Sequence, residues 1–151
     1  MSCVGKTRPG SGHCVADVLR EIVAAQDNIV GDTCNSSCEQ SIANLLGEVQ
    51  QVPSNLDTVP VLLYCKDCTP FEGFGAPFDE IADVVGSFYF RVNSIENNCA
   101  TLELLREEGS PADPVSPVQQ PTSDLVATGI CITVDVDCFC HITCLPPIAA
   151  L

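Results

Sequence analysis

Cysteine is the residue type most able to do chemistry in this chain of 151 residues, which contains eleven of them. They occur in every third of the sequence, at Cys3, Cys14, Cys34, Cys38, Cys65, Cys68, Cys99, Cys131, Cys138, Cys140 and Cys144. Because the number is odd, complete pairing within one chain leaves one thiol for another chain, a metal or nothing. A chain of this length can bury a core without covalent help, so the cysteines indicate durability or cross-linking.

Redox catalysis is one chemistry that the cysteines suggest. Cys65 and Cys68 form a Cys-Lys-Asp-Cys motif after an expected strand, which is the context of a thioredoxin-type pair. Such a pair needs a helix N-terminus to lower the pKa of its thiol, but residues 69–75 (TPFEGFG) do not predict a helix. We therefore expect no catalytic residue and predict that the protein is not an enzyme.

Zinc binding is the main alternative to cross-linking. A structural zinc site needs four thiolate or imidazole ligands, often as two closely spaced pairs. These ligands would come from two groups, Cys65 with Cys68, and two of Cys138, Cys140, His141 and Cys144. The second group has Cys-x-Cys-x-x-x-Cys spacing, which is not that of a zinc finger or ribbon. A buried thiol without a ligand role is the third interpretation, and we expect no metal or other cofactor.

The remaining cysteines are interpreted from their neighbours. Cys34 and Cys38 lie four residues apart at an expected loop-to-helix junction, close enough to pair with each other if the backbone turns. Cys3 lies in a segment rich in Gly, Ser and Pro, where a thiol on a flexible arm is suited to reach a neighbouring molecule. Cys99 follows an Asn-Asn turn and is expected to be exposed.

The other titratable residues have ordinary explanations. The two histidines, His13 and His141, have no evident partners for a catalytic triad, and His13 is expected to be solvated. Asp135 and Asp137 fit the polar face of a strand, and the Glu-Glu pair at 107–108 fits a solvated turn.

The charge of the chain excludes several classes of partner. Twenty acidic residues against six basic ones give a net charge of −14. The basic residues form no patch: they are Lys6, Arg8, Arg20, Lys66, Arg91 and Arg106. Nucleic acids and anionic membrane surfaces both require clustered Lys and Arg, so we expect no nucleic-acid and no membrane partner.

The compartment of the protein presents a contradiction. Met1–Lys6 has no apolar run after it and does not resemble a signal peptide, and no stretch of about 20 apolar residues occurs. We therefore expect synthesis in a reducing cytosol, yet the cysteine content is that of a secreted protein. Oxidation at a later stage, after the compartment changes, would remove the contradiction.

The N-terminal third is expected to be helical after a flexible arm at residues 1–13. From Cys14, apolar residues recur at helical spacing (Val15, Val18, Leu19, Ile22 and Val23). A second short helix is predicted from Ser37, which has capping-box spacing to Gln40, and it ends near Gly47. We expect the apolar side of both helices to face a core, in a helical part at about residues 14–50.

The rest of the chain is expected to form strands, at about residues 55–145. Short segments rich in β-branched or aromatic residues are predicted at 59–64, 87–92, 100–105, 125–128 and 130–136. The last one alternates strictly between apolar and polar residues, and the proline-rich run 109–121 is a loop. The predicted fold is α+β, with short N-terminal helices followed by an antiparallel β-sandwich in a single domain, residues 14–151.

Four segments resemble the cysteine-rich bacterial spore coat and exosporium proteins, the family of CotY, CotZ and ExsY. The matching stretches are Cys14–Asp27 (CVADVLREIVAAQD), Val61–Phe74 (VLLYCKDCTPFEGF), Phe90–Leu105 (FRVNSIENNCATLELL) and Cys131–Leu145 (CITVDVDCFCHITCL). The last is the most specific. The chain departs from the family pattern at its N-terminus, where residues 1–12 hold Cys3 but no His- or Cys-rich tract.

The resemblance implies a structural, self-assembling protein of the spore surface. The implied partners are further copies of itself, in a homo-oligomeric two-dimensional array that could contain hexameric units, and other coat or exosporium proteins. It also implies that all eleven cysteines are candidates for disulfide cross-linking. Synthesis in the mother-cell cytosol and oxidation during coat maturation would explain thiols in a protein without a signal peptide.

Overall fold

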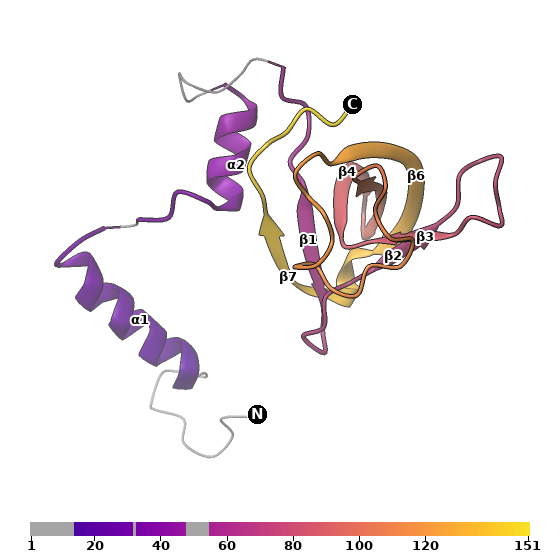
Figure 1. The fold of residues 1–151 in the computed structure, drawn as a ribbon. Coiled ribbons are helices and arrows are strands. Elements are labelled where there is room, and N and C mark those ends of the chain that lie inside the picture. The colour runs from indigo at the N-terminus through magenta and orange to yellow at the C-terminus, as the bar shows by residue number, and fades with distance from the viewer. Residues whose placement is uncertain (1–13, 32, 48–54) are drawn as a thin grey trace. The chain divides into compact units, whose positions relative to one another are not determined.

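The computed structural model describes residues 14–31, 33–47 and 55–151. The chain divides into two compact units, Met1–Asn35 and Ser36–Leu151. Helix α1 (Cys14–Asp27) belongs to the first unit, while helix α2 (Cys38–Leu45) and the described strands belong to the second (Figure 1). The predicted arm lies outside the described residues, and a single domain from residue 14 stays a prediction.

Helix α1 confirms the helix expected from Cys14 onward. Arg20 donates a hydrogen bond from Nη1 to Asp17 Oδ1 at 3.2 Å, a pair spaced for one helix face. The apolar stripe was expected to face a core, but none of the residues of α1 is buried. Leu19 and Val23 in that stripe are 55% and 53% exposed. Neither helix in the described residues is long and apolar enough to span a membrane.

Helix α2 begins and ends where the capping signals predict. Ser37 is its N-cap and accepts a hydrogen bond at Oγ from the backbone N–H of Gln40 at 3.1 Å. The chain leaves the helix at Gly47, whose φ of +76° lies in the left-handed region. Its buried residue is Ser41 rather than an apolar one, and the Ser41 hydroxyl donates to the carbonyl of Leu145 at 2.8 Å.

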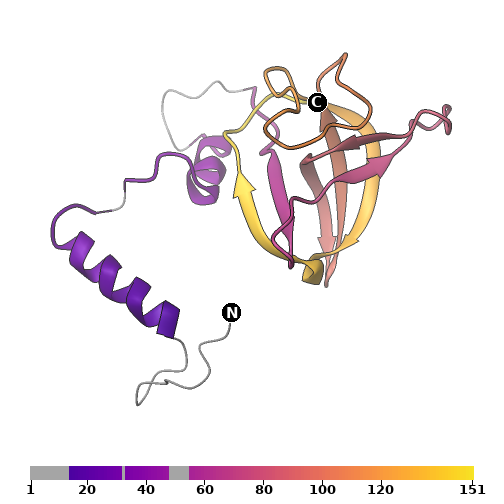
Figure 2. The same cartoon turned by 60° about the horizontal axis from the view of Figure 1, so that its bottom comes forward.

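A five-stranded antiparallel sheet forms the centre of the second unit, in the order β6-β5-β4-β1-β7. Its strands are β1 (Val61–Cys65), β4 (Tyr89–Glu96), β5 (Cys99–Arg106), β6 (Val126–Asp135) and β7 (Phe139–Cys144). The edge strands β6 and β7 are joined by the short 3₁₀ helix η1 (Val136–Cys138). The register shifts within three of the strand pairs, and such irregularities bend strands. The sheet is accordingly curled (Figure 2).

Strand β6 confirms the predicted alternation and joins two segments that were expected to be separate strands. Ile130 is buried, and the following residues alternate between half-buried and exposed side chains up to Asp137. The expected break falls at Gly129, whose φ of +78° lets the strand bend and continue.

A two-stranded ribbon, β2 (Gly73–Gly75) and β3 (Val85–Ser87), packs against the curled sheet. Its close approach requires glycine. A Cβ atom at Gly73 would lie 2.6 Å from Ile132 Cδ1, and one at Gly75 would lie 2.4 Å from Ile130 Cγ2. The structure therefore confirms an antiparallel α+β fold. In place of the two facing sheets of a sandwich, it has one curled sheet and this ribbon.

Two apolar clusters hold the second unit together. One is centred on Phe90, Leu102 and Leu104, each at most 1% exposed. Phe71 lies against Phe90 and Phe139, with ring centroids 5.6 and 5.1 Å apart. The other cluster contains Phe88, Tyr89, Leu105, Leu125 and Ala150.

The proline-rich loop 107–121 is fixed to the sheet by buried polar groups. Gln120 is 3% exposed; its Oε1 accepts the N–H of Phe88 at 2.9 Å, and its Nε2 donates to Ser87 Oγ at 2.9 Å. The guanidinium of Arg106 donates to the carbonyls of Gly86, Ser110 and Pro111. The loop is therefore an ordered part of the fold.

Glu72 lies beside Arg106 and the loop residue Asp113. Burial of Glu72, together with the hydrogen bond and negative charge of Asp113, raises the pKa of the Glu72 carboxyl to about 7, although Arg106 opposes the rise. A carboxyl with a raised pKa stabilises the fold while it is protonated. That contribution is complete below the ordinary pKa of 4.5 and is lost as the pH rises through about 7.

Replacing Glu72 by Gln should therefore flatten the pH dependence of stability. Between about pH 5 and pH 8 the wild type should lose unfolding free energy relative to Glu72→Gln, because only the wild type must ionise this group. Urea unfolding at several pH values measures the difference. Glu108→Gln, at an exposed position of the proline-rich loop, is the matched control. Parallel curves for wild type and Glu72→Gln would contradict the assignment.

Candidate cross-linking site

One disulfide closes the second unit. Cys38, at the start of α2, is bonded to Cys144, at the end of β7, across 106 residues of sequence and with Cα atoms 4.7 Å apart. Cys144 is 9% exposed and belongs to the apolar cluster around Phe90. This disulfide attaches α2 to the sheet, next to the hydrogen bond from Ser41 to Leu145.

This bond corrects one sequence-based expectation and restricts another. Cys38 does not pair with Cys34, its neighbour in the sequence, because its sulfur is bonded to Cys144. Cys144 therefore supplies no ligand to the zinc site considered above while the disulfide is intact. In the described parts of the chain, no three His, Cys, Asp or Glu side chains converge in a way that could hold a metal ion.

Three cysteines, Cys65, Cys138 and Cys140, belong to neighbouring positions where β1 ends and β7 begins, although their thiols do not converge on one point. Cys65 is paired with Phe139 in the sheet, and Cys138 and Cys140 are the sequence neighbours of Phe139. The register shifts between Tyr64 and Cys65, so Cys140 is skipped in the pairing. The thiol of Cys140 donates to the carbonyl of Cys65 at 3.0 Å. Cys138 and Cys140 are exposed and Cys65 is half-buried. We call this group the thiol corner.

Cys68 lies in the tight turn next to the thiol corner. The turn is closed by the N–H of Cys65, which donates to the carbonyl of Thr69 at 2.9 Å. Asp67 accepts hydrogen bonds from the N–H and the hydroxyl of Thr69, and these bonds lower the pKa of the Asp67 carboxyl. Cys68 has a φ of +69° and is exposed. The Cys65–Cys68 motif thus forms a turn rather than the start of a helix.

The surroundings of Cys138, one of the three thiols of the corner, disfavour its thiolate form. Burial raises the pKa of the Cys138 thiol, and the neighbouring Cys65 and Asp135 raise it further, while Lys66 opposes them. The pKa of Cys131, on β6, is also raised, by burial and by Glu103. Since the thiolate is the reactive form, a raised pKa leaves a smaller fraction of these two thiols reactive near neutral pH, opposite to the activated thiol of a redox enzyme.

The other cysteines are spread over the chain. Cys99, at the turn between β4 and β5, is exposed as expected, and Cys131 is exposed on β6. Cys14 is disulfide-bonded, and Cys34 is exposed. Cys3 and His13 lie outside the described residues. His141 packs on Tyr64 with ring centroids 4.5 Å apart, and Thr143 Oγ1 lies 3.4 Å from its Nε2.

Sequence reasoning identified all the cysteines but not the groups that act on them. Lys66 and Asp135 influence the same thiol, Cys138, although they lie far apart in the sequence. Asp135 could have been noticed, because it stands on the polar face of β6 three residues before Cys138. No local pattern indicates that Cys65 lies beside Cys138.

Comparison with known proteins identifies the family of this chain. A family model described as spore coat protein Z matches residues 1–147. The chain belongs to this family. A member of the spore coat protein Z family from Bacillus subtilis (strain 168), itself named spore coat protein Z, is 31% identical over 149 aligned residues, which cover 91% of either chain. No solved structure matches. The resemblance to spore coat proteins stated from the sequence is thereby confirmed.

Removing the internal disulfide should cost stability without affecting the exposed thiols. We expect Cys38→Ser with Cys144→Ser to lower the free energy of unfolding by about 2–4 kcal/mol, since the bond closes a long loop. Chemical denaturation of the oxidised proteins measures this, with Cys99→Ser with Cys131→Ser as the control pair. Equal midpoints for the variant and the wild type would show that the bond is not formed or not structural.

The charges around Cys138 should control its rate of alkylation. Asp135→Asn removes a negative charge that raises the thiol pKa, so iodoacetamide should label Cys138 faster below that pKa. Lys66→Gln removes the opposing positive charge and should slow labelling. Peptide mass spectrometry follows Cys138 with Cys99 as the internal reference, and an unchanged ratio in both variants would contradict the assignment.

Proposed function

We propose that this protein is a structural subunit of the bacterial spore coat or exosporium, which assembles with copies of itself into two-dimensional arrays that disulfides then reinforce. Membership of the spore coat protein Z family supports the location and the structural role. The B. subtilis relative carries the name of a coat protein. Other coat or exosporium proteins are the further partners of the proposed array.

The distribution of exposed thiols carries the proposal. The fold is closed by Cys38–Cys144, whereas at least five further cysteines lie at the surface of the second unit: Cys68, Cys99, Cys131, Cys138 and Cys140. They lie in two turns, on β6 and at the thiol corner. Neighbouring subunits could therefore reach them at several places on the surface. Such thiols contribute little to packing, but they can connect one subunit to several others.

Cross-linking requires only oxidation of these thiols. Two thiols lose two protons and two electrons as one sulfur–sulfur bond forms, and the electrons pass to an acceptor such as molecular oxygen or a small disulfide. The reducing mother-cell cytosol prevents this reaction during synthesis, and oxidation follows when the compartment changes. The raised pKa of the Cys138 and Cys131 thiols lowers their thiolate fraction and so slows this oxidation.

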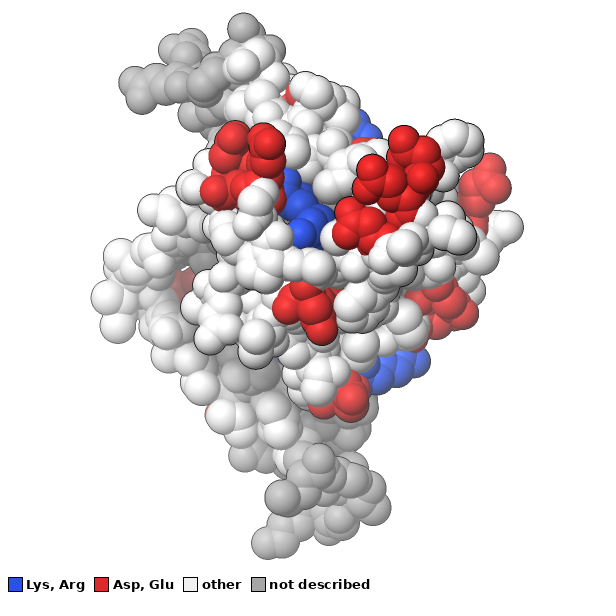
Figure 3. Space-filling view, turned by 45° about the vertical axis from the view of Figure 1, so that its right-hand side comes forward, with Lys and Arg blue, Asp and Glu red and all other residues white. Residues whose placement is uncertain are grey.

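The acidic surface would keep subunits apart before they assemble. Figure 3 shows many acidic side chains on one face and few basic ones among them. With a net charge of −14, separate subunits repel one another and stay dispersed, until local contacts or added ions overcome the repulsion. Assembly would therefore be reversible before oxidation makes it permanent.

Electron microscopy of the purified protein tests the proposal. We expect ordered sheets both in strong reductant and under oxidising conditions, with high-mass species on non-reducing gels only after oxidation. A variant with Ser at the five exposed positions (68, 99, 131, 138 and 140) should still form sheets, but oxidation should no longer protect them against denaturant. The matched control is Cys38→Ser with Cys144→Ser, whose oxidised sheets should stay resistant.

Two outcomes would contradict the proposal. Monodisperse monomers in both reductant and oxidant would remove the self-assembling role. The second outcome is that sheets of the five-serine variant resist denaturant as well as those of the wild type. That result would show that the exposed thiols do not reinforce the array.

A further inference from the structure

The concave face of the curled sheet is covered only in part. The β2–β3 ribbon lies over Phe90, Ile130 and Ile132, as the close approach of Gly73 and Gly75 shows. An apolar hollow of about 350 Å³ stays open next to β7 and η1. It is lined by side chains from the five-stranded sheet and η1, including Val92, Ile95, Val134, Phe139 and Ile142.

Several lining side chains are unusually accessible for apolar residues of a sheet. Val92, Ile95 and Ile142 are 44%, 61% and 50% exposed. Strand β4 pairs with β1 only at Phe90 and Tyr89, so the outer half of β4 stands apart from β1 and β7. The hollow is thus an uncovered continuation of the core.

The same unit carries an apolar projection. The loop between β2 and β3, residues 76–84, extends from the body of the unit (Figures 1 and 2). Two successive turns fix its shape: the N–H of Glu80 donates to Pro77 at 3.1 Å, and that of Asp83 donates to Glu80 at 2.9 Å. Phe78 is completely exposed and Ile81 is 84% exposed. We call these two side chains the apolar knob.

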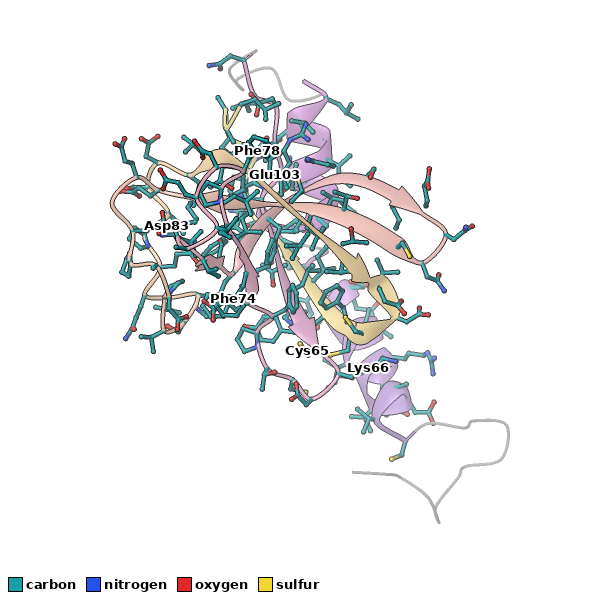
Figure 4. All side chains as sticks on the ribbon, turned by 90° about the vertical axis from the view of Figure 1, so that its right-hand side faces the viewer. Cys65, Lys66, Phe74, Phe78, Asp83 and Glu103 are labelled. Carbon is teal, nitrogen blue, oxygen red and sulfur yellow. A yellow bond between two sulfur atoms is a disulfide. The ribbon has the colours of Figure 1, made fainter. Side chains whose placement is uncertain are left out.

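The knob and the hollow of one molecule do not meet. Figure 4 places Phe78 and Asp83 away from Cys65 and Lys66. Phe139 lines the hollow and is paired with Cys65. Cys65 and Lys66 therefore lie on the same side of the unit as the hollow. The loop that carries the knob extends away from the body in Figure 1, and only a second molecule can bring a knob to this hollow.

We propose that the apolar knob of one molecule inserts into the hollow of a second copy. The contact joins two different surfaces, so each molecule offers a free knob and a free hollow to further copies. Repetition produces rings or open arrays rather than closed twofold dimers. This inference deepens the proposed self-assembly by naming one contact, and it rests on that proposal for the array in which the contact would repeat.

The small size of the contact means that it acts only together with other contacts, as between copies in an array. An aromatic side chain buries about 150–250 Å², so a loop with one phenylalanine and one isoleucine stays well below the roughly 1,200 Å² of a stable interface between two proteins. One such contact is weak in dilute solution. It becomes effective when neighbours are held at high local concentration by several contacts at once, as in an array.

Charge agrees with this choice of occupant. The knob loop carries Asp79, Glu80 and Asp83, and no basic residue occurs between Lys66 and Arg91. Lys66 stands near the hollow, close enough to Cys138 to lower the pKa of that thiol, while Asp135 raises the same pKa more strongly. An acidic loop would be attracted on the side of Lys66 and repelled on the side of Asp135, so charge selects the direction of entry. The attraction is modest and screened by salt, so it orients the contact rather than drives it.

The first test removes the knob from the full-length protein, with reductant present so that no disulfide contributes. Phe78→Ser with Ile81→Ser should raise the concentration needed for array formation about tenfold or more, measured by light scattering and microscopy. Lys66→Glu should raise it less. Val115→Ser with Val118→Ser, at equally exposed apolar positions of another loop, should leave it unchanged, and circular dichroism should show all variants folded. An unchanged concentration for the knob variant would overturn the proposal.

The second test locates the partner surface. A photoreactive benzoylphenylalanine replaces Phe78 in the full chain, mixed with an isotopically labelled copy and irradiated at high concentration in reductant. Mass spectrometry should find adducts between chains at Val92, Ile95 or Ile142. Adducts elsewhere, adducts within one chain or none at all would overturn the contact.

The two tests separate this contact from the proposed array. Arrays that form normally while the adducts lie elsewhere leave self-assembly standing and remove the contact. Adducts in the hollow without any arrays keep the contact and remove the array.

Discussion

The curl of the five-stranded sheet is the constraint on which the rest of the structure depends. The edge strands β6 and β7 are consecutive in the chain, and only the three residues of η1 join them, so the sheet must bend to bring its edges together. The bend is compatible with the ribbon only because Gly73 and Gly75 carry no side chain. It places Cys65 beside Cys138 and Cys140, and it leaves part of the concave face uncovered.

The cysteines accordingly fall into two physical groups. The Cys38–Cys144 bond is part of the core and fixes α2 to the sheet, so it acts within the fold. The exposed thiols of the second unit stand in turns and on outward positions, where they pack against little. Burial and acidic neighbours raise the pKa of Cys138 and Cys131.

The sequence predicted those features that local interactions determine. The helix from Cys14, the Ser37 cap and the alternation along β6 all follow from residues within a few positions of one another. A strand has one buried and one exposed face both in a sandwich and in a curled sheet. The alternation of apolar and polar residues therefore could not distinguish the two folds. What distinguishes them is irregular register between strands, which no local pattern indicates.

Long-range features escaped prediction for a related reason. Strand β2 consists of Gly-Phe-Gly, a sequence with low strand propensity that pairs only because the sheet beneath accommodates it. Cys38 has a cysteine four residues away, yet its partner is 106 residues away, because the end of β7 pairs with the start of β1, the first strand after α2. The exposure of Cys99 was predictable from its turn, whereas the meeting of Cys65 with Cys138 depends on tertiary structure.

The central claim is that the Cys38–Cys144 disulfide belongs to the fold of the second unit and that the exposed thiols belong to the proposed assembly. The most direct measurement is a disulfide map of oxidised arrays grown from an equal mixture of ¹⁴N- and ¹⁵N-labelled protein. The account predicts that peptides joined through Cys38 and Cys144 always share one isotope. It also predicts that links among Cys68, Cys99, Cys131, Cys138 and Cys140 include mixed isotopes. Mixed isotopes at Cys38–Cys144, or surface links that never mix, would contradict it.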